Sequence, residues 1–137
     1  MTTTVNFETS KLLKEKEFNI PTLYFYLDGS LKYNHSIKPR NSNVLPGTMD
    51  VSAPTIAEVV YWIYSKYDIW ISLIPDSSSG HKLLDRKFSV SIFRFNMNLN
   101  VQAEILRKDK NILYFNLPEN AFEYAIEYIL NTYKPTS

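Results

Sequence analysis

The spacing of apolar residues in the middle of the chain predicts an amphipathic helix. Thr55 and Glu58 match a capping box directly after Pro54, and the helix is expected to run to about Tyr67. The predicted core stripe of this helix consists of Ile56, Val59, Val60, Ile63 and Tyr67. The aromatic residues Tyr61 and Tyr64 fall outside the stripe, so the core does not account for them.

Two further helices are predicted towards the ends of the chain. Residues 8–17 are charged and favour a helix, with Thr9 or Ser10 as its N-cap. Near the C-terminus Pro118 can occupy the first helical position. The apolar stripe predicted for this last helix consists of Phe122, Ala125, Ile126, Ile129, Leu130 and Tyr133.

Alternation with a period of two predicts strands elsewhere. Asp28-Gly29 lies between two runs rich in tyrosine, phenylalanine and leucine, a strong hairpin signal. Residues 69–75 alternate as a strand, and a second hairpin is expected around 109–111. Between them, the apolar parity of 88–97 changes between Ile92 and Phe93, which indicates a bulge or a change of the buried face.

Together these elements predict one α+β domain over residues 1–137, with helices segregated from a mainly antiparallel sheet of about 4–6 strands. The C-terminal helix is expected to pack on that sheet. The expected parts are an N-terminal helix region (1–18), a hairpin (19–35), a long loop (36–53) and a helix-sheet-helix core (54–137).

Composition narrows the function classes. The chain has no cysteine, which argues against disulfides and thiolate metal sites. It has only three glycines, which argues against glycine-rich phosphate loops, and its net charge is +1. No apolar run approaches the roughly 18 residues of a membrane span, and the first residues lack the apolar region of a signal peptide. The expected location is therefore the cytoplasm.

Candidate catalytic chemistry is sparse. His35 lies in the first hairpin and His81 in a serine-rich turn, and neither has a second histidine nearby in sequence. Asp76, His81 and Asp85 form a loop cluster whose spacing matches no known metal site. The sequence therefore predicts a non-catalytic protein without metal or cofactor.

Aromatic residues make up 15% of the chain, and tyrosine offers a stiff contact area with a polar tip. Two surfaces follow as candidates for binding a partner protein. The first lies around the middle helix, and the second is the acidic last helix. Their predicted contact residues are Tyr61, Tyr64 and Trp70 for the first, and Tyr124, Tyr128, Glu123 and Glu127 for the second.

A basic region gives an alternative. Arg86, Lys87, Arg94, Arg107 and Lys108 could bind RNA through a sheet surface on which Arg94, beside Phe93 and Phe95, stacks bases. The competing interpretation is a solvated sheet edge that basic residues protect against strand pairing. The order helix, three strands, helix also resembles a double-stranded RNA-binding domain, but here the last helix begins at Pro118 without a basic residue.

The chain resembles a set of uncharacterised small proteins of phages, prophages and mobile elements, especially of Bacteroidetes. The resemblance rests on "LLKEKEF" followed by a hairpin, on "SAPTIAEVVYWIYSKYDIWISLIP" and on "ENAFEYAIEYIL". It implies a protein that binds and modulates a host or defence protein, such as an anti-CRISPR inhibitor, in the host cell cytoplasm. Two alternatives stay open, an RNA-binding module and an oligomeric sponge for a small ligand.

Overall fold

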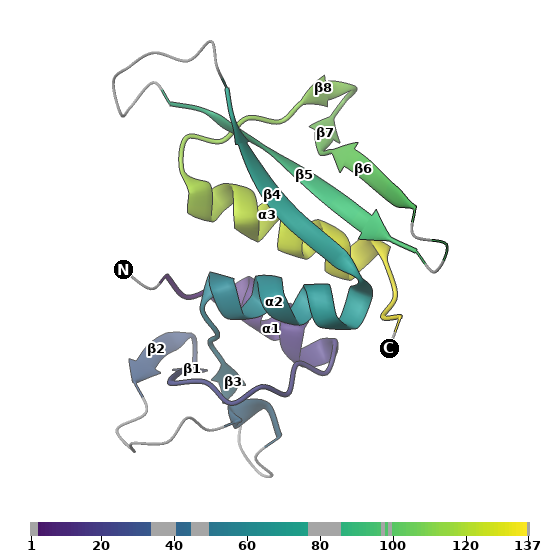
Figure 1. Cartoon of the computed structure of the whole chain (residues 1–137). Helices are drawn as coiled ribbons and strands as arrows, with labels where there is room; N and C mark the ends of the chain where they lie inside the picture. Colours follow the sequence, from purple (N-terminus) through teal and green to yellow (C-terminus); the bar gives the residue numbers. More distant parts are fainter. Residues whose placement is uncertain are drawn as a thin grey trace. The chain divides into compact units, whose positions relative to one another are not determined.

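The computed structural model describes residues 3–33, 41–44, 50–76, 86–96, 98 and 100–136. Within these residues three α-helices lie towards the N-terminus, in the middle and towards the C-terminus, and the strands pair antiparallel, which confirms the predicted α+β class (Figure 1). The chain forms two compact units, Met1–Val59 and Val60–Ser137. The predictions for His35, His81 and Asp85, and most of the predicted loop, lie outside the described residues.

The first unit contains the predicted hairpin. Strands β1 (Tyr24–Leu27) and β2 (Ser30–Tyr33) pair antiparallel, and β3 (Val51–Ser52) pairs with the other edge of β1. Asp28 and Gly29 both have positive φ, 50° and 80°, as a two-residue type I′ turn requires. A short 3-10 helix, η1 (Ser42–Val44), precedes β3.

Helix α1 (Phe7–Glu15) begins earlier than predicted. Asn6 is the N-cap, and its side chain accepts a hydrogen bond from the Thr9 backbone N–H at 2.8 Å. The prediction of Thr9 or Ser10 as the cap is therefore wrong. Asn6 caps the helix about one turn earlier, and both predicted caps become buried residues inside the helix.

The core of the first unit is built around the hairpin. Tyr26, Val51 and Ala53 are buried together, and Phe7 packs its ring against Tyr26 with the centroids 5.3 Å apart. The Tyr26 hydroxyl donates to the Val5 carbonyl at 2.7 Å, so this buried phenol has a partner. The tyrosine face of β1 is thus the face that the unit buries.

Helix α2 (Ile56–Tyr67) confirms the predicted capping box. The Thr55 N–H donates to the Glu58 carboxylate at 2.9 Å, and the Glu58 N–H donates to the Thr55 hydroxyl at 3.2 Å. Every residue of the predicted stripe is buried. The helix ends at Asp68, where a positive φ of 55° turns the chain directly into the next strand.

The second unit holds an antiparallel sheet in the order β4-β5-β6, formed by β4 (Ile69–Pro75), β5 (Phe88–Phe95) and β6 (Val101–Ile105). The register is continuous, with Trp70 opposite Phe93 and Phe93 opposite Ala103, so the predicted bulge in β5 is wrong. The apolar parity changes because β5 carries apolar side chains on both faces: Val90 and Ile92 on one, Phe93 and Phe95 on the other.

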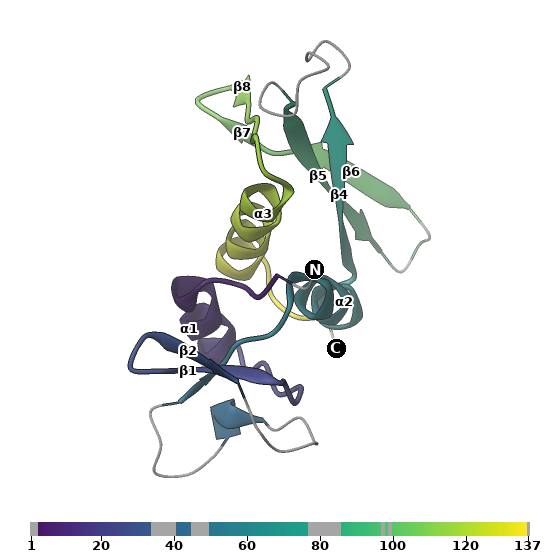
Figure 2. The same ribbon diagram turned by 90° about the vertical axis from the view of Figure 1, so that its left-hand side faces the viewer.

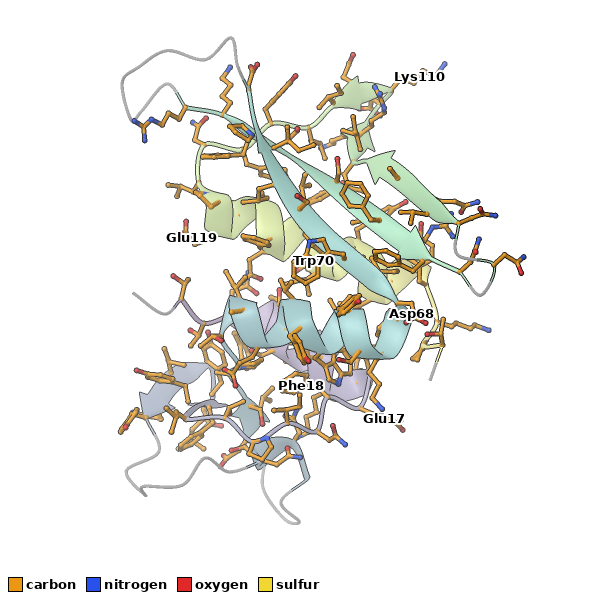
Figure 3. All side chains as sticks on the ribbon, viewed as in Figure 1. Glu17, Phe18, Asp68, Trp70, Lys110 and Glu119 are labelled. Atoms are coloured by element: carbon orange, nitrogen blue, oxygen red, sulfur yellow. The ribbon has the colours of Figure 1, made fainter. Side chains whose placement is uncertain are left out.

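A short ribbon follows the sheet. Strands β7 (Arg107–Lys108) and β8 (Asn111–Ile112) pair across Asp109 and Lys110, which both have positive φ, and Lys110 marks the tip of the ribbon in Figure 3. This ribbon confirms the hairpin predicted around 109–111.

Helix α3 (Pro118–Thr132) packs on β5 and β4, as predicted for the last helix (Figure 2). Its buried residues are Ala121, Ala125, Ile126, Ile129 and Leu130. They face Ile69, Ile71, Val90 and Ile92, which are the buried side chains on one face of the sheet. The described part of the chain contains no helix of the length and apolarity that a membrane crossing demands.

Candidate binding surfaces

The face of the sheet turned away from α3 carries no ionisable side chain. Because side chains alternate along each strand and the register is continuous, this outer face is defined by the residues opposite to the buried parity. They are Trp70, Ser72, Ile74, Ser89, Ser91, Phe93, Phe95, Val101, Ala103 and Ile105. Trp70, Phe95 and Val101 are 42%, 43% and 51% exposed, so large apolar groups of the outer face meet solvent, whereas Ser89 and Ser91 of the same face are buried.

An aromatic cluster lies at one end of the outer face. The Tyr64 ring of α2 contacts the Trp70 ring at 5.6 Å and the Phe95 ring at 6.0 Å, both nearly edge-on. The structure therefore brings together Tyr64 and Trp70 as predicted and adds Phe95. From sequence, Phe95 was considered only as a neighbour of Arg94, and only the strand register could reveal its contact with Tyr64. Tyr61 is 67% exposed, and within the described residues its ring does not join the Tyr64–Trp70–Phe95 cluster.

On the opposite face, polar groups tie α3 to the sheet. The Glu104 carboxylate of β6 accepts hydrogen bonds from the Tyr128 hydroxyl at 2.8 Å and the Tyr133 hydroxyl at 3.1 Å. The hydrogen bond to Glu104, followed by burial and the charge of the same carboxylate, raises the pKa of Tyr128 well above its usual value near 10. Burial first, and then Glu104, raise the pKa of Tyr133 as well.

A hollow of about 460 Å³ lies between β6 and α3, next to this network. It is lined by the consecutive residues 103–107 and by Tyr124 and Tyr128. The Tyr124 ring is held against Phe115, with the centroids 5.6 Å apart. Tyr124 and Tyr128 are thus half-buried walls of a hollow, and Glu123 and Glu127 are half-buried on the same helix. Sequence analysis named these four residues of α3. It did not name Glu104, which lines the hollow and is placed there by the strand register.

The predicted basic residues do not gather on one sheet face. Arg94 lies on the face opposite to Phe93 and Phe95, where its guanidinium stacks on the Tyr133 ring at 4.9 Å and donates to Gln102 at 2.6 Å. Arg86 and Lys87 are exposed just before β5, whereas Arg107 and Lys108 belong to the β7–β8 ribbon. The proposed stacking of bases by Arg94 beside two phenylalanines therefore has no matching geometry.

The described ranges contain no cluster of metal-binding side chains. No group of three or more histidine, cysteine, aspartate or glutamate side chains is close enough there to hold an ion.

Comparisons of the chain with protein-family models, with curated proteins and with solved structures gave no match in any of the three.

Proposed function

We propose that this chain is a non-catalytic binding protein of a phage or mobile element, which docks on a host or defence protein through the outer face of its second sheet. The observation that carries the proposal is the uncharged outer face with the exposed Tyr64–Trp70–Phe95 cluster. A host protein is the proposed partner because of the sequence resemblance to phage and mobile-element proteins. The site of action is then the host cell cytoplasm.

The physical support is that apolar side chains exposed on such a face are unfavourable in water. An antiparallel sheet commonly covers one face and leaves the other polar, but here both faces carry large apolar side chains. Contiguous exposed apolar surface is typical of protein interaction sites. Tryptophan and tyrosine are also the residues that most often dominate binding energy at the centre of an interface.

The Tyr64–Trp70–Phe95 cluster has the rigidity expected of an anchor. Each ring is held edge-on by its neighbour, so little side-chain entropy remains to be lost when a partner covers it. The cluster also joins the end of α2 to β4 and β5, which places a helix surface next to a sheet surface. A partner would then contact a stiff, preorganised patch.

The test is capture of a partner from nuclease-treated host lysate by the tagged chain and by two variants. Trp70→Lys places a charge in the cluster, in contact with the Tyr64 ring, and is expected to abolish capture. Lys66→Ala alters a neighbouring residue of α2 outside the outer face and is expected to retain it. A partner that both variants capture equally would contradict docking through this face. Capture that is seen from untreated lysate and lost from nuclease-treated lysate would contradict a protein partner.

A further inference from the structure

A second, different binding element lies on the other side of the same sheet. We propose that the hollow between β6 and α3 binds an extended peptide, which adds as a strand to the free edge of β6 and places a lysine or arginine side chain beside Glu104. This site uses the backbone edge of β6 and the α3 side of the sheet, whereas the function proposed above uses the side chains of Tyr64, Trp70 and Phe95, so the two can be tested independently.

The edge of β6 offers backbone groups for such a strand. In the described part of the chain β6 pairs with β5 alone. The Leu106 N–H donates to the Val90 carbonyl at 3.0 Å, and hydrogen-bonded pairs alternate along an antiparallel ladder. Glu104 therefore points its backbone groups at β5. Ala103 and Ile105 point theirs away from it, about 6.8 Å apart.

These outward backbone groups lie at the hollow. Ala103 and Ile105 both line it, yet their side chains leave from the outer face. These two residues therefore present their backbone N–H and C=O groups to the hollow. Helix α3 packs mainly on β5 and β4, so β6 extends past the helix and leaves room beside it. A groove between an edge strand and a helix is a recurring setting for peptide recognition by strand addition.

The chemistry of the walls selects the side chain that enters. Both phenol hydrogens of Tyr128 and Tyr133 are donated to Glu104, so the tyrosine oxygens offer lone pairs, and the carboxylate adds a negative charge. Arg107 also lines the hollow, but its guanidinium donates to the Lys110 carbonyl at 3.5 Å in the β7–β8 ribbon, so Glu104 is the charged group beside the two hydroxyls. A side chain that donates hydrogen bonds and carries positive charge complements this wall. The Tyr124 and Tyr128 rings are also flat surfaces on which a guanidinium or the stem of a lysine can lie. The volume of about 460 Å³ is in the range of ligand sites.

A pool of short synthetic peptides provides the probe. Each peptide has β-branched residues on both sides of a central arginine or lysine, and a matched pool carries glutamate at the centre. Binding is followed by amide chemical shifts of the isotope-labelled full chain. The basic pool is expected to give saturable shifts at the Ala103 and Ile105 amides, and the acidic pool is expected to give none.

Two proline variants separate strand addition from simple contact with the hollow. Ile105→Pro removes an outward N–H without touching the ladder to β5, a place where an edge strand tolerates proline. We expect it to weaken the selected peptide by at least about tenfold, the usual effect of one backbone hydrogen bond left unmade. Val101→Pro removes an outward N–H of the same strand beyond the hollow and is expected to change affinity less than about twofold.

The results that overturn the proposal are equally concrete. They are a complete lack of saturable shifts with the basic pool at millimolar concentration, shifts confined to the Tyr64–Trp70–Phe95 cluster, and equal affinity for wild type and Ile105→Pro. Methylation of the peptide backbone nitrogens keeps the proposal testable if Ile105→Pro fails to fold. If the methylated peptide binds as tightly as its parent, the added strand does not form.

Discussion

Removal of the Tyr128 hydroxyl tests how α3 is fixed to the sheet. Tyr128→Phe deletes a hydrogen bond of 2.8 Å to the Glu104 carboxylate and leaves the ring in place. Hydrogen bonds to charged groups contribute about 1.5–3 kcal/mol to stability. Tyr128 is only half-buried, so we expect the low end, a loss of about 1.5 kcal/mol in the free energy of unfolding.

The assay is urea unfolding of the full chain followed by circular dichroism. Glu104→Gln and the double variant complete a cycle, in which the coupling energy between the two residues is expected to be about 1 kcal/mol. Tyr61→Phe is the matched control. Its ring is 67% exposed, so loss of its hydroxyl should change stability by less than about 0.5 kcal/mol.

The pH dependence gives a second readout. The folded state raises the pKa of Tyr128, so it holds the phenol proton more tightly than the unfolded chain does. The stabilisation is therefore fully present below about pH 10, where both states are protonated, and decreases as the pH rises above 10. The stability difference between wild type and Tyr128→Phe should be constant at neutral pH and shrink in this alkaline range.

Two outcomes would refute this account of the network. A coupling energy below about 0.3 kcal/mol between Tyr128 and Glu104 would mean that the bond contributes nothing that water does not replace. A difference between wild type and Tyr128→Phe that stays constant above pH 10 would mean that the proton of Tyr128 is not held by Glu104 in solution.

Two further substitutions test the helices. Glu17 follows α1 with a φ of 65°, and the Phe18 N–H donates to the Leu13 carbonyl at 2.9 Å in a Schellman motif, so Glu17→Gly should raise stability by about 0.5–1 kcal/mol in urea unfolding. A loss of stability would contradict the strain at this position. The Tyr67 hydroxyl is buried and has no hydrogen-bond partner in the described ranges, so Tyr67→Phe should stabilise the protein by about 1 kcal/mol. Tyr26→Phe, which breaks the bond to Val5, should destabilise it by a similar amount, and equal effects of the two would refute this reasoning.

Sequence patterns sufficed where the structure depends on neighbours in the chain. The capping box of α2 joins residues three positions apart, and the Asp28-Gly29 turn depends on two adjacent backbone conformations. The stripe of α2 follows from the helical period alone. In α3 the predicted residues Ala125, Ile126, Ile129 and Leu130 are buried, whereas Phe122 and Tyr133 are half-buried and Ala121 is buried in addition. The N-cap of α1 was missed because Asn6, Thr9 and Ser10 are all good caps, and local sequence does not rank them.

The candidate sites depend on pairings between distant residues, which no local pattern contains. Phe95 meets Tyr64 because β4 pairs with β5 in one particular register. Glu104 meets Tyr128 because α3 crosses the sheet at one position, 24 residues further along the chain. Sequence could therefore name tyrosines as candidates but could not name the carboxylate that organises them.

The parity change at Ile92 and Phe93 connects the two proposed sites. A strand that is covered on one face alone needs apolar side chains on one parity, and the second apolar parity of β5 is covered only in part, by the Tyr64 ring against Phe95, which stays 43% exposed. The apolar residues Phe93 and Phe95 belong to the outer face, and the polar residue Arg94 supports Tyr133 on the face of α3. The same few residues thus present an uncharged surface on one side of the sheet and position the Glu104 network on the other. The irregular sequence pattern of β5 is explained by these two demands together.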